Sequence, residues 1–404
     1  MSNKSRICVC TPYPASAEPR GPRHARALAE LFPEREIVFL DCAPIGSKNV
    51  ATPALGELPN LRWITHYFPT KKNPIILCVH KLRARIASFF FQITGLLLPE
   101  IFTPRVIGIE KILTDLAADV YFPHNIELLL PTLRSMPEGS SLLFDCMEFY
   151  SDMGAGQTPA IRRAVSELES AAIPKCTLLT TSSPQVSAAY LAAYEAKKTL
   201  SLYNCPPRSD SIEQGESDPI KLYWRNSVLG LGQRGLEGAL DALVNLPHDI
   251  TLHLQGNLGF DRGATLKRAI DDRNLKSRVF LLPPHGPDEA VSAASPHTIG
   301  LCLEQSGVQN HELTVSNKIF DYMMSGLAVI SSDLTGLSQV IHDSKGGLLF
   351  EPGSSESLAN QILHLKNHPE ELAKLRNNAR SYALKYGNRE AQMKSFKQTV
   401  ISHI

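Results

Sequence analysis

Residues 314–333, TVSNKIFDYMMSGLAVISSD, carry polar groups whose types and spacing suit the binding of an anion. Ser316 can serve as a helix N-cap, because its hydroxyl can accept a backbone N–H that the first turn leaves unpaired. The positive end of that helix, with Lys318 in its first turn, would hold a phosphate. Asp321 lies on the same face as Asn317 and Lys318, one turn further on, where it could bind hydroxyl groups. The spacing thus predicts both contacts that a nucleoside diphosphate needs.

A helix followed by a buried strand must position these groups. Gly326 stands where a left-handed C-terminal residue is expected, and the apolar run 327–330 predicts a parallel strand buried on both faces. Four apolar residues recur at helical spacing before it: Ile319, Phe320, Met323 and Met324. Such a unit is also the commonest one in any α/β protein. The alternative is a plain surface pair of Lys318 and Asp321, worth about 0.2–0.5 kcal/mol.

The bulk properties set limits on the class of protein. A chain of 404 residues is too long for one ordinary core, which favours two domains. Its 41 basic and 40 acidic residues leave a formal net charge of +1, and a nucleic-acid binder would show a basic excess. The eight cysteines form no CxxC pair, so no zinc site is expected. The start, MSNKSRICVC, runs straight into a strand without a signal peptide, and we expect a reducing, cytoplasmic location.

A first candidate ligand loop follows the first predicted strand. Residues 6–11 form that strand, residues 11–22 form a loop, and a helix begins after Gly21 with HARALAEL. The loop lies at the carboxyl end of the strand, where open α/β sheets bind ligands. No GxGxxG pattern occurs, so this is not a dinucleotide fingerprint. Gly21 is therefore either part of a ligand loop or a plain turn glycine.

Polar groups also end two later strands. His124 follows the strand predicted at 119–122, and the segment DCME (145–148) follows the strand at 141–144. Catalytic residues collect at such strand ends, which makes His124 a candidate, although a lone histidine is more often structural.

The segment 71–98 differs in character from the rest of the chain. Six basic or histidine residues precede an apolar run of 13 residues, IASFFFQITGLLL. The run is too short to cross a bilayer, which takes about 20 residues. It predicts either a helix resting on an anionic membrane surface or an ordinary amphipathic core helix with a solvated basic flank.

The β-α alternation occurs twice along the chain. The polar, proline-bounded stretch 206–219 is the best linker and separates a first domain, 1–205, from a second, 220–387. The second half restarts with a strand at 220–224, a loop containing Arg225, and a helix that begins at Arg234. We therefore predict an α/β protein with two doubly wound, Rossmann-like domains facing across a cleft.

With this order established, the chain resembles a retaining glycosyltransferase of the GT-B fold, glycosyltransferase family four (group 1). The strongest part is SNKIFDYMMSGLAVISSDLTGLSQVI with GGLLFEPGSSESLANQI, which is similar to the family's "PSKIFEYMAAGLPVIASD…G…EVI" and "GLLVPPGD…LA" segments. In the first half, LLFDCMEFY resembles "yDaHElf", and LYNCPP resembles "viyNgpd" at the domain junction. The resemblance covers nearly the whole chain.

The resemblance implies roles for individual residues. Asp321 stands where the family's glutamate holds the donor's ribose hydroxyls. Arg225 matches the arginine of the "VGR" segment and Arg234 the lysine of "KGL", and both would grip the diphosphate, which planar guanidinium groups bind bidentately. His124 matches the histidine placed close to the transferred sugar. The resemblance also implies that the helix at 388–404 packs back on the first domain.

The chain departs from the family pattern in three places. The first glutamate of the family's E-x7-E pattern, counted back from Asp321, falls on Leu313. Glu304 and Glu312 have that spacing in another register, so either Glu312 is displaced into the role or loop amides replace it. The histidine expected in "DaHE" is Met147, and the arginine-to-lysine spacing in the second domain is longer than in the family.

Together these features predict a hexosyltransferase-type enzyme. It would move a sugar from a UDP- or GDP-sugar to a glycan or lipid-linked glycan with retention of configuration, in the synthesis of surface polysaccharide or glycoconjugate. The nucleotide sugar is a substrate, so no separate cofactor is expected, and the lack of a DxD pair indicates metal-independent catalysis. The alternatives are a GT-B nucleotide-sugar epimerase and a non-catalytic partner subunit.

Overall fold

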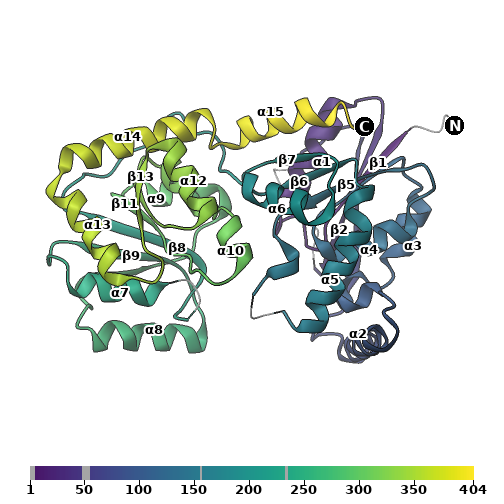
Figure 1. Ribbon diagram of the computed structural model, residues 1–404, viewed down its shortest axis with the longest axis horizontal. Helices are drawn as coiled ribbons and strands as arrows, with labels where there is room; N and C mark the ends of the chain where they lie inside the picture. Colours follow the sequence, from purple (N-terminus) through teal and green to yellow (C-terminus); the bar gives the residue numbers. More distant parts are fainter. Residues whose placement is uncertain (1–4, 48–54, 155–156, 233–234) are drawn as a thin grey trace. The chain divides into compact units, whose positions relative to one another are not determined.

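The computed structural model describes residues 5–47, 55–154, 157–232 and 235–404 (Figure 1). The chain forms two compact units, residues 1–202 with 393–404 and residues 203–392. Each unit is built on one parallel sheet, so the prediction of two Rossmann-like α/β domains is confirmed.

The sheet of the first unit has seven strands in the order β3-β2-β1-β4-β5-β6-β7. Every pairing in it is parallel. Its strands are β1 (Arg6–Cys10), β2 (Glu36–Pro44), β3 (Leu61–Phe68), β4 (Val120–Pro123), β5 (Ser141–Cys146), β6 (Leu178–Thr181) and β7 (Thr199–Ser201). The order reverses between β1 and β4, and ligands of open α/β sheets bind outside the carboxyl ends of strands at such a switch point.

Helices and short 3-10 turns connect these strands. The helices are α1 (Arg20–Leu31), α2 (Pro74–Thr94), α3 (Ile109–Leu116), α4 (Ile126–Ser135), α5 (Pro159–Ala172) and α6 (Pro184–Tyr194). The turns are η1 (Pro99–Ile101), η2 (Pro104–Val106), η3 (Tyr150–Asp152) and η4 (Ile173–Lys175).

The sheet of the second unit has six parallel strands in the order β10-β9-β8-β11-β12-β13. These are β8 (Lys221–Leu229), β9 (Thr251–Leu258), β10 (Val279–Leu282), β11 (Ile299–Cys302), β12 (Ala328–Ser332) and β13 (Gly347–Phe350). Its helical elements are α7 (Leu236–Val244), α8 (Phe260–Asp272), η5 (Pro287–Glu289), α9 (Ala290–Ala294), α10 (Gln309–Leu313), α11 (Lys318–Met324), α12 (Thr335–Ser344), α13 (Ser355–Asn367) and α14 (Pro369–Lys385). The switch point here lies between β8 and β11.

The stretch predicted as a linker belongs to the second unit. Within residues 206–219, the Gly215 N–H donates to the Ser295 carbonyl at 2.8 Å, and Arg376 donates to the Ser217 hydroxyl at 2.8 Å. The last helix, α15 (Arg389–Val400), begins in the second unit and ends in the first. There Phe396 and Val400 are fully buried in the core of the first unit.

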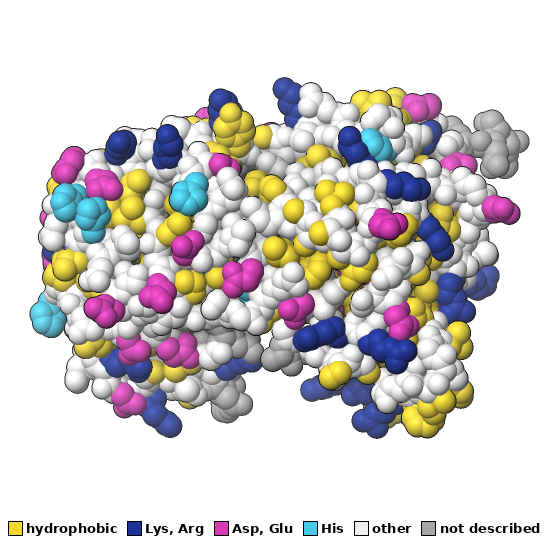
Figure 2. All heavy atoms as spheres, viewed as in Figure 1, with side chains coloured by type: hydrophobic (Ala, Val, Ile, Leu, Met, Phe, Trp, Pro, Cys, Tyr) yellow, Lys and Arg dark blue, Asp and Glu magenta, His cyan; other side chains and the backbone are white. Residues whose placement is uncertain are grey.

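Helix α2 is not a core helix, so that alternative is wrong. Only Ala87 and Phe91 of its twenty-one residues are buried. Figure 2 shows apolar and basic side chains together on the surface over α2, at the lower right of the view. None of the described helices is both long and apolar enough for a bilayer span.

Candidate functional site

In the second unit, Arg225 and Asp321 meet beside the switch point. Arg225 comes from β8 and Asp321 from α11, and the guanidinium donates from Nη2 to Oδ2 of the carboxylate. The Arg225 backbone N–H donates to the Tyr322 hydroxyl at 3.2 Å, which fixes the strand against α11. The two residues that the resemblance assigned to phosphate and ribose are thus direct neighbours, although 96 positions separate them.

The Arg225 guanidinium is largely buried but retains donors. Burial by itself would lower its pKa, and the Asp321 carboxylate outweighs that effect, so the pKa of Arg225 is raised. Its Nε is buried and has no hydrogen-bond partner among the described residues. The side chain nevertheless remains 24% exposed, so the charged guanidinium can bind an anion as a further partner.

The start of α11 differs from the prediction. The helix begins at Lys318, and its N-cap is Asn317, which has helical φ and ψ of −54° and −30° and makes no side-chain cap bond. Ser316 is not the N-cap: its backbone carbonyl, rather than its hydroxyl, accepts the N–H of Ile319 at 3.1 Å. The predicted cap was wrong because the chain turns into the helix one residue later.

Lys318 is buried in an ion pair that the sequence did not indicate. Its Nζ lies 2.6 Å from Oε1 of Glu304, and both side chains are less than a tenth exposed. Glu304 follows β11, so this contact also lies at the switch point. Lys318 therefore does not present a free charge to a phosphate. In the sequence, Glu304 is notable only for its E-x7-E spacing to Glu312, which does not indicate Lys318 as its partner.

The other residues that were predicted to bind the nucleotide sugar are more exposed, or lie outside the described residues. Ser316 is partly exposed and Asn317 is exposed, while Glu312 lies in α10 and is partly exposed. Arg234 lies outside the described residues.

A cavity of about 440 Å³ opens among loops that follow β8, β11 and β13, lined by Gly232, Gly235, Leu303, Gln305, Ser306 and Gly353 among others.

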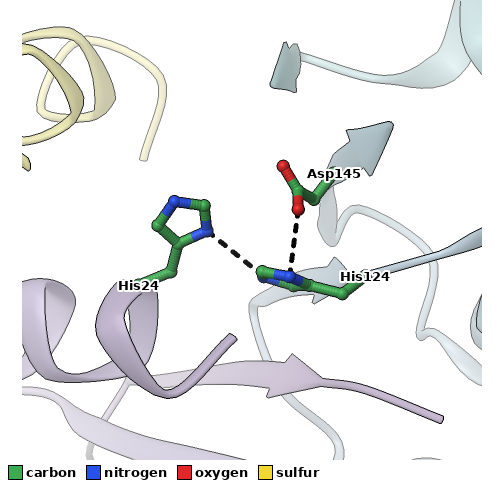
Figure 3. Close-up of side chains that lie close together, drawn as sticks. All are labelled: His24, His124 and Asp145. Atoms are coloured by element: carbon green, nitrogen blue, oxygen red, sulfur yellow. Dashed lines mark hydrogen bonds and ion pairs between the residues drawn. The ribbon is translucent and has the colours of Figure 1, made fainter. Parts of the chain in front are cut away.

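In the first unit, His124 and Asp145 meet at the ends of neighbouring strands, as their positions indicated. Nδ1 of His124 lies 3.1 Å from Oδ2 of Asp145, and its Nε2 lies 3.3 Å from Nδ1 of His24 (Figure 3). The His24 ring in turn stacks between Phe122 and Phe396, with centroids 5.3 and 4.4 Å away. All three polar side chains are fully buried, so His124 reaches solvent through neither nitrogen.

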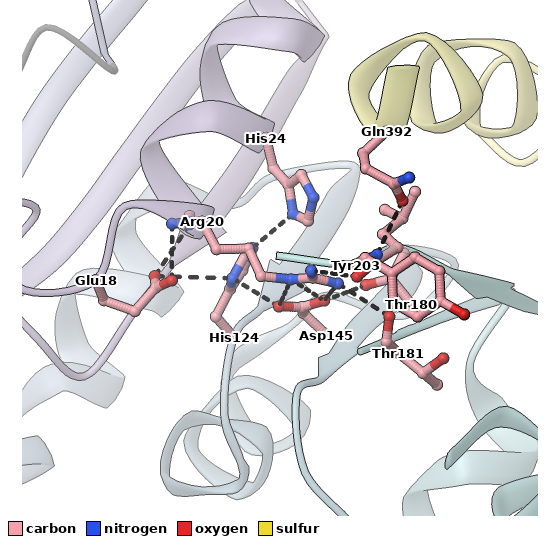
Figure 4. Close-up of polar contacts among 11 residues, drawn as sticks. Glu18, Arg20, His24, His124, Asp145, Thr180, Thr181, Tyr203 and Gln392 are labelled. Atoms are coloured by element: carbon pink, nitrogen blue, oxygen red, sulfur yellow. Dashed lines mark hydrogen bonds and ion pairs between the residues drawn. The ribbon is translucent and has the colours of Figure 1, made fainter. Parts of the chain in front are cut away.

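Arg20 is the centre of this buried network (Figure 4). Its Nε and Nη2 donate to the Asp145 carboxylate at 2.8–3.0 Å. Its remaining N–H groups reach the backbone carbonyls of Leu202 at 2.7 Å and Thr181 at 3.2 Å. Sequence reasoning missed Arg20, because nothing in the sequence indicates which carboxylate 125 residues away it would meet.

Gly21 lies inside α1, not in the loop before it. The helix begins at Arg20, so the predicted loop is shorter than expected. Glu18 accepts the backbone N–H groups of Arg20 at 2.8 Å and Gly21 at 3.0 Å, two of the donors that a helix start leaves unpaired. A Cβ at position 21 would lie 3.0 Å from Oε2 of Glu18. Gly21 thus allows the close approach of Glu18, whose Oε2 also lies 4.0 Å from Nδ1 of His124.

The protonation states of the network follow from burial and charge. Burial would raise the pKa of Asp145, but Arg20 and then His124 hold it well below its usual range, so the carboxylate stays ionised. Burial lowers the pKa of His24 well below its usual value and keeps this ring neutral. His24, His124 and Asp145 are close enough to bind a metal ion together. The bidentate guanidinium of Arg20 already neutralises Asp145, however, and would repel a second cation.

Two residues shortly after His124 are unusual, one in its backbone conformation and one in the pKa of its carboxyl group. Asn125 adopts a φ of 70°, unusual for a residue with a side chain, and its Oδ1 accepts the N–H of Glu127 at the start of α4. Burial raises the pKa of Glu127 to about 7, against the opposing charge of Arg105. A carboxylic acid that titrates near neutrality at this sheet edge is a candidate for proton transfer.

The neutral state of His24 makes the stability of the first unit depend on pH. The unfolded His24 binds a proton near pH 6.5 and the folded one does not, so stability falls as the pH falls below 6.5. We expect His24 to contribute up to about 1.4 kcal/mol per pH unit between pH 6.5 and 5. His24→Gln, which cannot titrate there, should flatten the dependence. Urea unfolding at both pH values, followed by Trp63 fluorescence in a Trp224→Phe background, measures this, and equal pH dependences would contradict it.

Comparison with known proteins adds three findings. Residues 231–368 match the family model described as glycosyl transferases group 1. No curated protein sequence matches the chain. Solved structures match it over both units: sucrose-phosphate synthase from Thermosynechococcus elongatus has 16% identity and a TM-score of 0.71, with 99% of each chain covered.

Two further structures show the same likeness. HepE from Anabaena, solved in complex with UDP-glucose, has 15% identity and a TM-score of 0.67, over 98% of this chain and 99% of that one. A glycosyltransferase from Rickettsia africae has 13% identity and a TM-score of 0.66, over 99% of both chains. At these identities the likeness establishes the shared two-domain fold, which is that of GT-B glycosyltransferases.

Proposed function

We propose that this chain, whose second unit contains a group 1 glycosyltransferase domain, transfers a sugar from a nucleoside-diphosphate sugar to a glycan or lipid-linked glycan. The observation that carries the proposal is the contact of Arg225 with Asp321 at the switch point of that unit. It pairs a cation suited to phosphate oxygens with a carboxylate suited to ribose hydroxyls. The UDP-glucose bound by the Anabaena protein supports a UDP-sugar as donor.

In the proposed reaction, the bond between the anomeric carbon and the phosphate oxygen breaks as the acceptor oxygen bonds to that carbon. The diphosphate gains negative charge, and fixed hydrogen-bond donors aimed at such charge usually contribute most to the rate enhancement of an enzyme. We assign this role to Arg225 and Arg234, with the N–H groups at Ser316 and Asn317 as further donors. Lys318, held by Glu304, contributes less. The acceptor hydroxyl attacks from the face that the phosphate leaves and passes its proton to that phosphate, so the configuration at the anomeric carbon is retained.

The buried position of His124 suggests a positioning role. It contacts Asp145 and His24 and lies beneath Glu18 and Gly21, which come from the loop and helix start after β1. We propose that His124 fixes this edge of the first sheet, against which the sugar or the acceptor binds. The surface of that edge, rather than the imidazole itself, would then contact substrate.

Donor identity is tested first. Calorimetry with UDP and GDP should show binding of one of them, and a screen of the matching sugar nucleotides should show slow donor hydrolysis. Binding of neither nucleotide would exclude a UDP-sugar and a GDP-sugar as the donor. Formation of an epimerised sugar from donor alone would indicate an epimerase. NMR of the product's anomeric proton tests retention, and activity in EDTA tests metal independence.

Asp321→Asn should weaken nucleotide binding. The carboxylate would accept hydrogen bonds from the ribose hydroxyls, and bonds to a charged acceptor are worth about 1.5–3 kcal/mol, so the Kd for the nucleotide should rise about 10- to 100-fold. Calorimetry measures this directly. Asp343→Asn, an exposed acid of α12, is the control and should leave the Kd unchanged. The 2′,3′-dideoxynucleotide should bind both Asp321→Asn and the unaltered chain with similar affinity; a large remaining difference would refute the ribose assignment.

A further inference from the structure

The outer face of α2 is a large apolar surface that the proposed sugar transfer does not use. Six of its side chains, which we call the outer stripe, are between 45% and 79% exposed: Ile75, Val79, Leu82, Ile86, Phe89 and Ile93. They are spaced alternately by four and three residues, which places them in one line along the helix. Single exposed apolar residues are ordinary, but a continuous line of six indicates a surface that is covered in use.

The opposite face of α2 holds the helix on the first unit. Ala87 and Phe91 are buried with Ile101 of η1 and Ala164 of α5. Arg163 of α5 also lies over the Phe91 ring, 5.3 Å from its centroid. Ile86 and Phe91 are five residues apart, which is about 140° around a helix. The outer stripe therefore points away from the unit that anchors the helix.

Every charged residue of segment 71–98 is basic, since the segment contains no Asp or Glu. Arg83 pairs with Glu100 at 2.6 Å. Four further cations have no ion pair within the part of the chain that the structure describes: Lys71, Lys72, Lys81 and Arg85. Figure 2 shows basic side chains beside the apolar ones over α2.

We propose that α2 is an interfacial helix that lies flat on an anionic lipid bilayer, with the outer stripe embedded among the acyl chains. The unpaired cations then meet anionic headgroups at the helix flank and start. A second copy of this chain is a poorer occupant, because two α2 helices packed together would bring eight unpaired cations into one interface without an acid. The inference does not depend on the sugar-transfer chemistry, so each can fail alone.

Cys78 provides a native probe for this surface. It lies in α2 and is exposed, while the other seven cysteines are buried. An environment-sensitive fluorophore on Cys78 should shift to the blue when vesicles of phosphatidylcholine with 30% phosphatidylglycerol are added at 0.1 M salt. Pure phosphatidylcholine vesicles should give a much smaller shift. Binding should weaken at 1 M salt but persist in part, because salt screens the charges and not the apolar contacts.

Two variants separate the apolar and charged contributions. Phe89→Ser/Ile93→Ser should lower the vesicle partition coefficient about 100-fold or more, since each side chain loses its transfer into the acyl region. Lys81→Gln/Arg85→Gln should lower it about 10- to 30-fold on the anionic vesicles only, at about 1 kcal/mol per basic residue. The control Leu191→Ser/Ile401→Ser removes side chains that are 47% and 55% exposed elsewhere on the same unit, and should bind as the unaltered chain does.

Three outcomes would overturn the inference. The unaltered chain could fail to bind anionic vesicles at low salt, or both α2 variants could bind them as well as the control. Sedimentation could instead show a dimer that Phe89→Ser/Ile93→Ser dissociates, which would make a second copy the occupant. Urea unfolding followed by Trp63 fluorescence, in a Trp224→Phe background, should be the same in all variants, which shows that the first unit is folded in each.

Discussion

Replacing Arg225 with alanine should lower turnover by about 100-fold or more, the usual effect of losing one donor aimed at developing charge. The guanidinium is held at the switch point by Asp321 and by its own backbone bond to Tyr322, so its position is fixed before the donor binds. Because the diphosphate gains charge as the sugar leaves, kcat should fall more than the affinity for the donor.

The control variants for Arg225 distinguish geometry from charge. Arg225→Lys keeps the charge and loses the planar fork, so it should recover only part of the activity. Arg268→Ala removes an exposed arginine of α8 and should be silent. Single-turnover rates check chemistry, and urea unfolding followed by Trp224 fluorescence in a Trp63→Phe background checks folding of the second unit. A folded Arg225→Ala enzyme with turnover within threefold of the unaltered chain would exclude the phosphate assignment.

Replacing Arg20 with methionine should destabilise the first unit by about 3–5 kcal/mol. The Asp145 carboxylate is fully buried, and removing the partner of a buried ion leaves an uncompensated charge in a poor solvent. The carbonyls of Thr181 and Leu202 lose a donor at the same time. Urea unfolding followed by Trp63 fluorescence, in the Trp224→Phe background, reports on this unit alone, since the chain has one tryptophan in each.

A second substitution tests whether charge is the cause. Arg20→Met/Asp145→Leu removes both ions and should regain much of the lost stability, because apolar groups of similar volume often replace a buried pair without loss. Arg134→Met is the matched control: its exposed pair with Glu110, at 3.4 Å, should contribute less than about 1 kcal/mol. If the single and double variants were equally unstable, packing rather than charge would explain the loss.

The parts of this fold that the sequence predicts are those governed by periodicity. The apolar run 327–330 was predicted as a strand, and β12 begins within it at Ala328. Gly326 follows the preceding helix with a φ of 71°. The end of a parallel strand also has a fixed place at the sheet edge, which is why His124 and Asp145 could be expected as neighbours. These features depend on residues close together in the chain, where spacing alone carries the information.

The parts that the sequence could not predict depend on partners far apart in the chain. The pairing of Glu304 with Lys318 buries an ammonium that looked available for phosphate, and it is decided by the path of the chain between β11 and α11. For α2, the hydropathy of the sequence shows which residues are apolar. It does not show which of them the fold buries and which it leaves exposed. The start of α11 moved by one residue because helix ends are set by local hydrogen bonds that propensity barely separates.

The position of Phe396 has a consequence for how the chain is assembled during synthesis. This ring, with Val400, completes the core of the first unit and stacks on His24, close to the other end of the chain. A nascent chain can form the second sheet while its earlier half still lacks these two side chains. The half that leaves the ribosome first is therefore closed last, and until then its unfinished core is exposed to solvent and to chaperones.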